Sequence, residues 1–176
     1  CVPRFPTTEH WKGIRKMILH TIRLTLCAAI TIAIAGRAHS QLLVTDALGI
    51  GSGNNVLRSD SKSGAFIDIF AEGGGLQNPN FMTFGPDGNL YVGSVGTDNV
   101  LRYDGATGAF IDVFASGGGL NTPGGLQFGP DGNLYVASNV TQNVLRYDGA
   151  TGAFMDVFAS GGGISGPVGL LFGPDG

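Results

Sequence analysis

Residues 99–148 read NVLRYDGATGAFIDVFASGGGLNTPGGLQFGPDGNLYVASNVTQNVLRYD, and the opening phrase NVLRYD returns at the end. Leu57, Leu101 and Leu145 hold the same place in three copies of this phrase, 44 residues apart. A repeat of this length indicates an architecture in which each copy forms one supersecondary unit that packs on its neighbours. The repeat therefore decides the fold class before any single residue is considered.

Each copy contains four short apolar runs of near-alternating polarity, a pattern typical of β-strands. In the best-covered copy these runs are Gly125–Phe128, Asn133–Ser138, Asn143–Asp148 and Phe154–Ala159. No stretch after residue 40 has the apolar period of a helix. Four antiparallel strands in about 40–45 residues form the blade of a β-propeller, whereas leucine-rich repeats are shorter and carry an Asn/Leu ladder. We predict an all-β propeller built from 44-residue, four-stranded blades.

Glycine-bearing turns separate the runs. The phrase GPDG occurs at residues 85–88, 129–132 and 173–176. Its proline, aspartate and final left-handed glycine suit a tight hairpin. A longer hairpin is expected at Gly105–Ala109 and its counterparts. The GGG triplets lie at residues 73–75, 117–119 and 161–163. Three glycines are too flexible for a strand interior, so we expect them to cross from one unit to the next.

An arginine and an aspartate lie ten residues apart across the longer hairpin of each copy. The pairs are Arg58 with Asp68, Arg102 with Asp112 and Arg146 with Asp156. Direct pairing would stabilise the hairpin by about 0.2–1 kcal/mol. It would also gather Leu101, Tyr103, Ile111 and Val113 on one apolar face, whereas a shift by one residue would mix charges into both faces. We predict the direct register, with unpaired solvated charges as the alternative.

The phrases GPDGNLYVAS and NVLRYD resemble NHL-type repeats, in which a Gly-Asn-hydrophobic-Tyr-Val-Ala phrase forms the second strand of a blade. They are also similar to the related six-bladed propellers of gluconolactonases and streptogramin lyases. The resemblance covers Gln41 to Gly176 and implies the fold rather than an activity, because the phrase builds the blade. Gluconolactonases hold a divalent metal with Glu, Asn and Asp, and streptogramin lyases depend on a histidine. Nothing after residue 40 matches the first set by position, and no histidine occurs there.

The first forty residues differ in character from the repeats. Residues 1–16 show no periodicity, and we interpret them as a non-structural upstream segment. Residues 17–40 read as a secretory signal peptide, with a positive start, the apolar run Leu24–Ala35, and small residues before a cut at Gln41. The run is too short to span a membrane, and an uncleaved anchor or a lipid on Cys27 are the alternatives. We predict a secreted or extracytoplasmic protein, in the periplasm or at the cell surface, whose mature chain has no membrane span.

The remaining residues, 41–176, form the predicted partial propeller domain. After Gln41 the sequence contains four basic and twelve acidic residues, which argues against a nucleic-acid partner. Both cysteines and all three histidines precede Gln41, so we expect no cofactor, no metal and no triad or thiol catalysis in this domain. Glu72 reads as a solvated edge charge. GPDGN and GGG read as a turn and a linker rather than as calcium or phosphate loops.

The candidate binding residues lie in loops that differ between copies. The loops are Thr45–Asn54, Ser94–Asp98 and Ser138–Gln142, and the crossings are Leu120–Pro123 and Ile164–Pro167; together we call them the loop rim. In blade topology both kinds of segment open on one face, where ligand loops usually lie. The candidates carry hydroxyl and amide groups and are Ser94, Thr97, Asn121, Thr122, Ser138, Asn139, Thr141 and Gln142. These groups suit a glycan, a peptide or a surface protein, and ordinary polar loops are the alternative.

Two functions remain open at this stage. The first is a secreted or cell-surface binding or scaffold module, with its ligand on the loop rim or in the central channel. The second is a lactonase-like or lyase-like enzyme with catalytic residues in blades outside this sequence. About three blades are present, and QLLV at Gln41 is a weaker form of NLYV, so the first unit starts at its second strand. Three blades form an incomplete ring, since propellers use about 4–8. We expect either further blades or dimerisation of the three-blade unit.

Overall fold

The computed structural model describes residues 41–47 and 53–174. The predicted upstream segment and signal peptide, residues 1–40, lie outside this range, as does part of the Thr45–Asn54 loop. The described residues form eleven β-strands and no helix, so they contain no helix able to cross a membrane. The predicted all-β class is confirmed.

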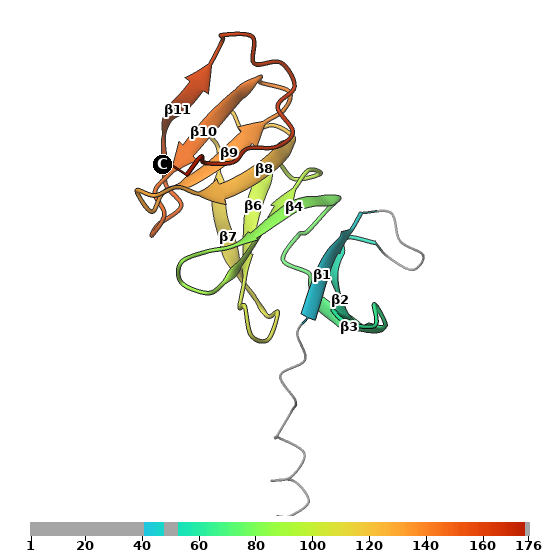
Figure 1. Cartoon of the computed structure of the whole chain (residues 1–176). Helices are drawn as coiled ribbons and strands as arrows, with labels where there is room; N and C mark the ends of the chain where they lie inside the picture. The colour runs from blue at the N-terminus through green and yellow to red at the C-terminus, as the bar shows by residue number, and fades with distance from the viewer. Residues whose placement is uncertain (1–40, 48–52, 175–176) are drawn as a thin grey trace, which may run out of the picture. The chain divides into compact units, whose positions relative to one another are not determined.

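The strands form three antiparallel sheets (Figure 1). The first sheet contains β1 (Gln41–Asp46), β2 (Asn55–Asp60) and β3 (Phe66–Glu72). The second blade contains β4 (Pro79–Phe84), β5 (Leu90–Ser94), β6 (Asn99–Tyr103) and β7 (Phe110–Ser116). The third blade contains β8 (Pro123–Phe128), β9 (Leu134–Ser138), β10 (Asn143–Tyr147) and β11 (Phe154–Ser160). Each sheet is a meander in chain order, as expected for propeller blades.

Among residues 41–47 and 53–174, the first sheet has no counterpart of the strand that opens each complete blade. Val44 of β1 lies opposite Leu57, just as Val92 of the second strand β5 lies opposite Leu101. β1 therefore corresponds to a second strand, which confirms the prediction for the first unit.

The predicted turns are present at the two GPDG hairpins that lie wholly within the described residues, 85–88 and 129–132, and at the GGG crossings. Gly88 and Gly132 close their hairpins in the left-handed region, with φ of 80° and 79°. The amide of Gly85 donates to the carbonyl of Asn89 over 2.9 Å, which fixes the start of β5. The GGG triplets have positive φ throughout and connect β3 to β4 and β7 to β8.

The predicted Arg–Asp register is confirmed in all three units. Arg102 donates to Asp112 through Nε over 3.1 Å and through Nη2 over 2.6 Å. The predicted apolar face is wrong at one position. A β-bulge places Phe110 opposite Tyr103, with their ring centroids 5.7 Å apart, so that Ile111 is the extra residue of the bulge.

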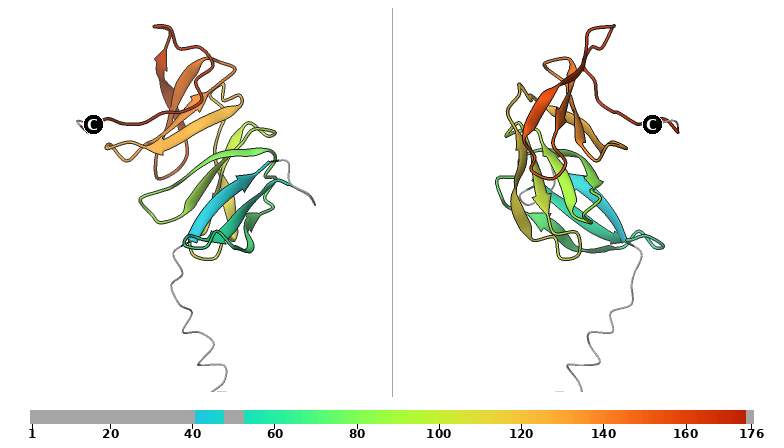
Figure 2. Two further views of the ribbon diagram at one scale, coloured as in Figure 1. Left: turned by 45° about the vertical axis from the view of Figure 1, so that its right-hand side comes forward. Right: turned by 90° about the vertical axis from the view of Figure 1, so that its left-hand side faces the viewer.

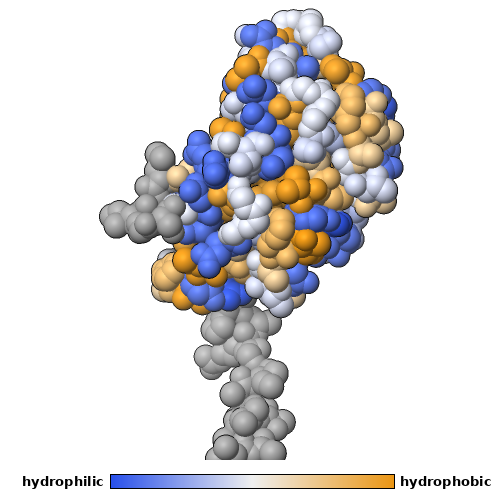
Figure 3. Space-filling view, turned by 180° about the vertical axis from the view of Figure 1, so that it is seen from behind, coloured by the Kyte–Doolittle hydropathy of each residue, from blue (hydrophilic) through white to orange (hydrophobic). Residues whose placement is uncertain are grey.

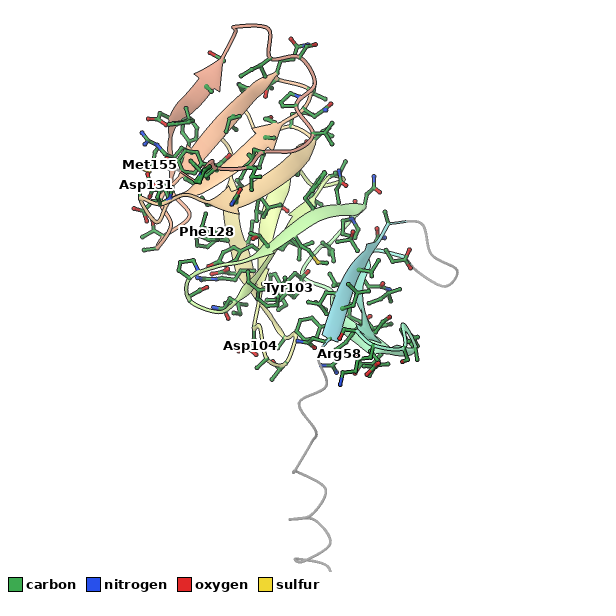
Figure 4. The ribbon with its side chains drawn as sticks, in the orientation of Figure 1. Arg58, Tyr103, Asp104, Phe128, Asp131 and Met155 are labelled. Atoms are coloured by element: carbon green, nitrogen blue, oxygen red, sulfur yellow. The ribbon has the colours of Figure 1, made fainter. Side chains whose placement is uncertain are left out.

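Hydrophobic cores lie between consecutive sheets. The core between the second and third blades contains Tyr91, Val100, Phe114, Ala115, Leu120, Leu126, Leu134, Val136, Leu145 and Tyr147. An equivalent core joins the first sheet to the second blade. The first strands β4 and β8 are in contact, and Figure 2 shows them side by side at the junction of the two blades. Figure 4 shows Phe128 below β8, toward the second blade, where its ring meets Tyr91 at 4.9 Å.

Each complete blade is also fixed to the crossing that precedes it. The hydroxyl of Tyr103 donates to the carbonyl of Gly73 over 2.9 Å, and Tyr147 makes the same bond to Gly117. Burial raises the pKa of Tyr103 to about 12. Tyr103 and Tyr147 lie at the ends of β6 and β10 that are away from the rim loops, so these bonds fix the start of each crossing to the body of the following blade.

Candidate functional site

In the second blade, the loop after β5 is bonded to the crossing that leads into β4. The buried hydroxyl of Ser94 accepts from the amide of Gln77 over 2.9 Å and donates to the carbonyl of Gln77 over 3.1 Å. It also shares a 2.6 Å hydrogen bond with Thr97, whose hydroxyl donates to Asn99 over 2.9 Å. One serine therefore holds the loop and the crossing together.

The third blade repeats this arrangement. The amide of Asn121 donates to the hydroxyl of Ser138 over 2.9 Å, and Thr141 donates to the same hydroxyl over 2.6 Å. The amide of Asn139 donates to the carbonyl of Thr122 over 3.2 Å. The loop and the crossing therefore lie on the same face, as predicted from blade topology.

Hydrogen bonds also join the loop rim from one unit to the next. The amide of Asn78 donates to the side chain of Asn54 over 2.6 Å, and the amide of Thr122 donates to Asp98 over 2.8 Å. All four residues have positive φ, between 51° and 61°. In these two units, the side chain that precedes β2 or β6 thus fixes the crossing into the next blade.

The eight predicted binding residues fall into two groups by accessibility. Ser94 and Ser138 are buried and serve the loops themselves. The other six are exposed or half-buried and are Thr97, Asn121, Thr122, Asn139, Thr141 and Gln142. The structure brings five of the eight together around Ser138 in the third blade. Asn139 extends the set by donating to the carbonyl of Pro167 over 3.4 Å.

The predictions did not include several residues of the same rim. Gln77 is bonded to the predicted Ser94, and Asp98 is bonded to the predicted Thr122. Asn78 is bonded to Asn54, and Val140 is exposed at the tip of its loop. Variation between copies could have indicated Gln77 and Asn78, because the aligned positions 121 and 122 are Asn and Thr. Val140 was missed because only polar side chains were considered.

A second polar cluster surrounds the GPDG hairpin of the third blade, where Figure 4 labels Asp131. Asp131 accepts from the hydroxyl of Tyr135 over 2.9 Å and lies 3.8 Å from Nη1 of Arg146, which pairs with Asp156. Burial disfavours the charged Asp131 carboxylate. Hydrogen bonds from Asn133 and Tyr135, and the charge of Arg146, outweigh burial and lower its pKa.

The second blade contains the same cluster with nearly the same geometry. Asp87 accepts from Tyr91 over 3.0 Å and lies 3.8 Å from Arg102. The guanidinium of Arg102 also lies 5.0 Å from the ring centre of Phe114. Because every member is bonded within its own blade and the set recurs, the cluster stabilises the blade hairpins.

Glu72 is exposed at the end of β3, in agreement with its reading as an edge charge. Among residues 41–47 and 53–174, no three His, Cys, Asp or Glu side chains are grouped so that they could hold a metal ion.

A groove of about 140 Å³ opens on the outer face of the third blade. Its lining consists of Tyr135, Val144, Phe158, Ala159, Leu170, Leu171 and Phe172. All of these side chains are apolar apart from the tyrosine hydroxyl, which is bonded to Asp131. The groove therefore offers hydrophobic contact rather than groups for catalysis.

Comparison with known proteins identifies propellers among solved structures. Hydrazine synthase from Kuenenia stuttgartiensis aligns with a TM-score of 0.60 and 22% identity, over 78% of this chain and 37% of that chain. Virginiamycin B lyase from Staphylococcus aureus aligns with a TM-score of 0.57 and 19% identity, over 78% and 47%. A nidogen/laminin complex aligns with a TM-score of 0.52 and 22% identity, over 65% and 41%. Neither a protein-family profile nor a curated protein matches the chain.

These likenesses confirm the predicted β-propeller and its resemblance in fold to the streptogramin-lyase type. Identities of 18–22% in the lyase, synthase and nidogen/laminin structures support the fold alone. The chain spans less than half the length of each of these three structures.

Proposed function

We propose that this chain is an extracytoplasmic propeller module that binds a glycan or an extended peptide on its loop rim. The observation that carries the proposal is that the buried residues of the loop rim are the same in both blades, whereas its exposed residues differ. Buried Ser94 and Ser138 hold the loops through the same bonds, while the exposed residues above them differ. Fixed loops that present changing side chains are the usual construction of a binding surface.

The chemistry of the rim fits a neutral, hydrogen-bonding ligand. Above Ser138 the loop presents Asn139, Val140 and Gln142, which combine amides with one exposed apolar side chain. Above Ser94 the equivalent positions are Val95, Gly96 and Asp98. Amide groups beside an apolar contact suit a sugar ring or a peptide backbone. The nidogen/laminin structure, a complex by its title, is consistent with a propeller that binds a protein partner.

The second candidate is an extracytoplasmic lyase-like or lactonase-like enzyme. The likeness in fold to virginiamycin B lyase favours it. Residues 41–176 contain no histidine or cysteine, so catalytic groups of those kinds would have to come from outside residues 41–176. An assay of this chain for lyase or lactonase activity separates the candidates, because activity would favour the enzyme.

The binding proposal is tested with glycan and peptide arrays probed by residues 41–176, the part of the chain that carries every described strand. We expect selective binding that decreases at least tenfold in an Asn139→Ala/Gln142→Ala double variant, about 1.4 kcal/mol. Lys62→Ala is the control, because Lys62 is exposed in the β2–β3 hairpin at the other end of the strands. Equal binding by both variants would place the ligand elsewhere, and no binding to either array would contradict the proposal.

The location is tested separately by expressing the full chain in a secreting host. We expect the exported product to begin at Gln41. Retention of Trp11 in the exported product would contradict the signal peptide.

A further inference from the structure

One row of side chains crosses each sheet at its loop-rim end, and the row of the first sheet differs from the other two. In the second blade the row consists of Ser94, Asn99 and Ser116. The third blade repeats it with Ser138, Asn143 and Ser160. In the first sheet acidic residues replace both serines, because Asp46 and Glu72 lie opposite Asn55. Directly opposite residues share one face of a sheet, with Cβ atoms about 4.5–5.5 Å apart, so this row gathers three oxygen-bearing side chains.

The asparagine at the centre of the first row has a carbonyl oxygen without a donor. In the second blade the hydroxyl of Thr97 donates to Oδ1 of Asn99 over 2.9 Å, and the third blade has the same bond over 3.0 Å. The residue two positions before Asn55 is Gly53, which has no hydroxyl. Asn55 is only 6% exposed, and its Oδ1 atom has no hydrogen-bond partner in the described part of the chain. An unpaired buried oxygen is costly, so this position points to a ligand.

The described residues offer this row no positive charge. Neither carboxylate can donate to Asn55, because ionised carboxylates only accept hydrogen bonds. Three of the four basic side chains between residues 53 and 174 pair with aspartates of their own hairpins, and these are Arg58, Arg102 and Arg146. The fourth, Lys62, lies in the β2–β3 hairpin at the other end of the strands. The row therefore joins two negative charges to a buried carbonyl oxygen without a cation from these residues.

Acidity alone would not distinguish this row from the rest of the surface. Hydrophilic residues are spread over the whole face shown in Figure 3, and residues 41–176 contain many more acidic than basic side chains. Other carboxylates already have donors, since Asp98 accepts from the amide of Thr122 and Asp131 accepts from Tyr135. The first row differs because a buried, unpaired oxygen lies between its two carboxylates.

We propose that Asp46, Asn55 and Glu72 bind one calcium ion at the loop-rim end of the first sheet. Calcium takes about 6–8 oxygen ligands, which include carboxylates and amide carbonyls. The three side chains supply about three to five of these oxygens, and water completes the shell. So few protein ligands give weak binding, and we expect a Kd of about 0.1–1 mM, the range of extracellular calcium modules. Magnesium suits the row less well, because it demands a small, nearly ideal octahedral shell.

The ion would join the strands of the first sheet at the rim, where hydroxyl groups do so in the other blades. In the second blade this connection runs from Ser94 through Thr97 to Asn99. The expectation of a domain without metal rests on the absence of histidine and cysteine, which are ligands of zinc. That absence leaves a site made only of oxygens open.

The site does not depend on what precedes Gln41. In the second blade the amide of Gln77, in the crossing before β4, donates to Ser94. An amide in the same place beside the first sheet would use one oxygen of Asp46 and leave the other for the ion. The unpaired oxygen of Asn55 has its counterpart's donor inside the blade itself, so no neighbouring blade is needed to explain it.

The test is calcium titration of the full chain, freed of metal with a chelator, by calorimetry and by thermal unfolding. We expect one saturable site per chain, and a melting temperature that rises by a few degrees at calcium tenfold above Kd. Asn55→Ala keeps the net charge and removes only the amide, so it should weaken calcium binding at least tenfold. The matched control is Asn99→Ala, at the same position of the second blade, which should leave calcium affinity unchanged.

The same two variants give a second readout without calcium. Asn55→Ala should unfold at the same temperature as the unchanged chain or higher, because it removes an unpaired buried oxygen. Asn99→Ala should unfold at a lower temperature, because it breaks the bond from Thr97. An Asp46→Ser/Glu72→Ser variant gives the first row the residues of the other two blades, so it should fold and lose its response to calcium.

Three results would overturn the proposal. The first is no saturable binding at calcium tenfold above the expected Kd. The second is equal calcium affinity in Asn55→Ala and the unchanged chain. The third is an equal rise of the melting temperature with magnesium, because that would indicate screening of the acidic domain rather than a calcium site.

Discussion

The second and third blades have nearly the same sequence but different surroundings. β7 reads FIDVFAS and β11 reads FMDVFAS, yet Phe114 is 5% exposed and Phe158 is 51% exposed. Inside the blades the geometry is unchanged, since Arg102–Asp112 and Arg146–Asp156 have the same hydrogen-bond lengths of 3.1 and 2.6 Å. The hydrogen-bond geometry inside a blade is therefore determined by the blade's own sequence, whereas the exposure of its faces is determined by the neighbouring blade. The 44-residue repeat is sufficient to form the four-stranded sheet and its Arg–Asp pair, while burial of the faces of the sheet depends on the next blade.

The largest difference between the two blades should appear on truncation of the bulge phenylalanine. Phe114→Ala removes a buried ring from the interblade core and should reduce the free energy of unfolding by about 3–5 kcal/mol. Phe158→Ala should cost much less in dilute solution, because half of this side chain is already solvated. Denaturant unfolding of both variants at low protein concentration measures the two losses. Equal losses would mean that the third blade is covered in the same way as the second.

Glycine at the longer hairpin gives the next largest contrast. Gly108 and Gly64 both have positive φ, 75° and 71°, so alanine at either position should cost about 1–2 kcal/mol through the backbone. Only Gly108→Ala also forces a Cβ against the carbonyl of Phe70, which should add about 1–3 kcal/mol. Thermal unfolding of the two variants in dilute solution checks the difference, and identical melting temperatures would exclude the close contact.

The buried rim serines should instead behave alike, because their bonds lie within one blade and its crossing. Ser94→Ala and Ser138→Ala each leave a backbone amide without its acceptor, at a cost of about 1–3 kcal/mol. The two losses of unfolding free energy should agree closely. A much smaller loss for Ser138→Ala would show that the third blade's rim is held less firmly than the structure indicates.

An effect that is absent at neutral pH concerns Tyr103 and Tyr147, whose pKa values burial raises from 10.0 to about 12. Both hydroxyls stay protonated in the folded chain at a pH where the unfolded chain has released its protons. Stability should therefore fall as pH rises from 10 toward 12, and it should change no further from this source above that range. Tyrosinate absorbance measures the titration, and a Tyr103→Phe/Tyr147→Phe variant should lose its highest step. Titration of all tyrosines near 10 would contradict the burial.

Features that depend on one copy alone could be predicted from the sequence. The GPDG hairpins, the four-strand blade and the Arg–Asp register all follow from spacing and charge within 44 residues. The bulge at Ile111 could not be predicted, because an alternating pattern does not reveal an extra residue. The rim was placed on the correct face, but Ser94 and Ser138 were expected at the surface, since a hydroxyl in a loop has the same sequence signature whether buried or exposed.

Contacts between consecutive repeats of the chain could not be predicted from the sequence either. Asp98 accepts from the amide of Thr122, and Asn54 accepts from the amide of Asn78. The acceptor is thus Asn in one repeat and Asp in the next, and the donor is Asn in one and Thr in the other, so no shared residue type marks the contact. The accessibility of Phe158 depends on a neighbouring blade, and its sequence is shared with a buried position.

Hydrogen exchange of β7 and β11 tests the central claim most directly. The two strands differ only at Ile111 and Met155, so their intrinsic exchange rates are nearly equal and any difference reports on the surroundings. In dilute solution we predict that amides of residues 154–160 exchange faster than those of residues 110–116, because only the second blade is packed on both faces. Equal exchange of the two strands under those conditions would contradict the claim that the neighbouring blade determines how firmly each blade is held.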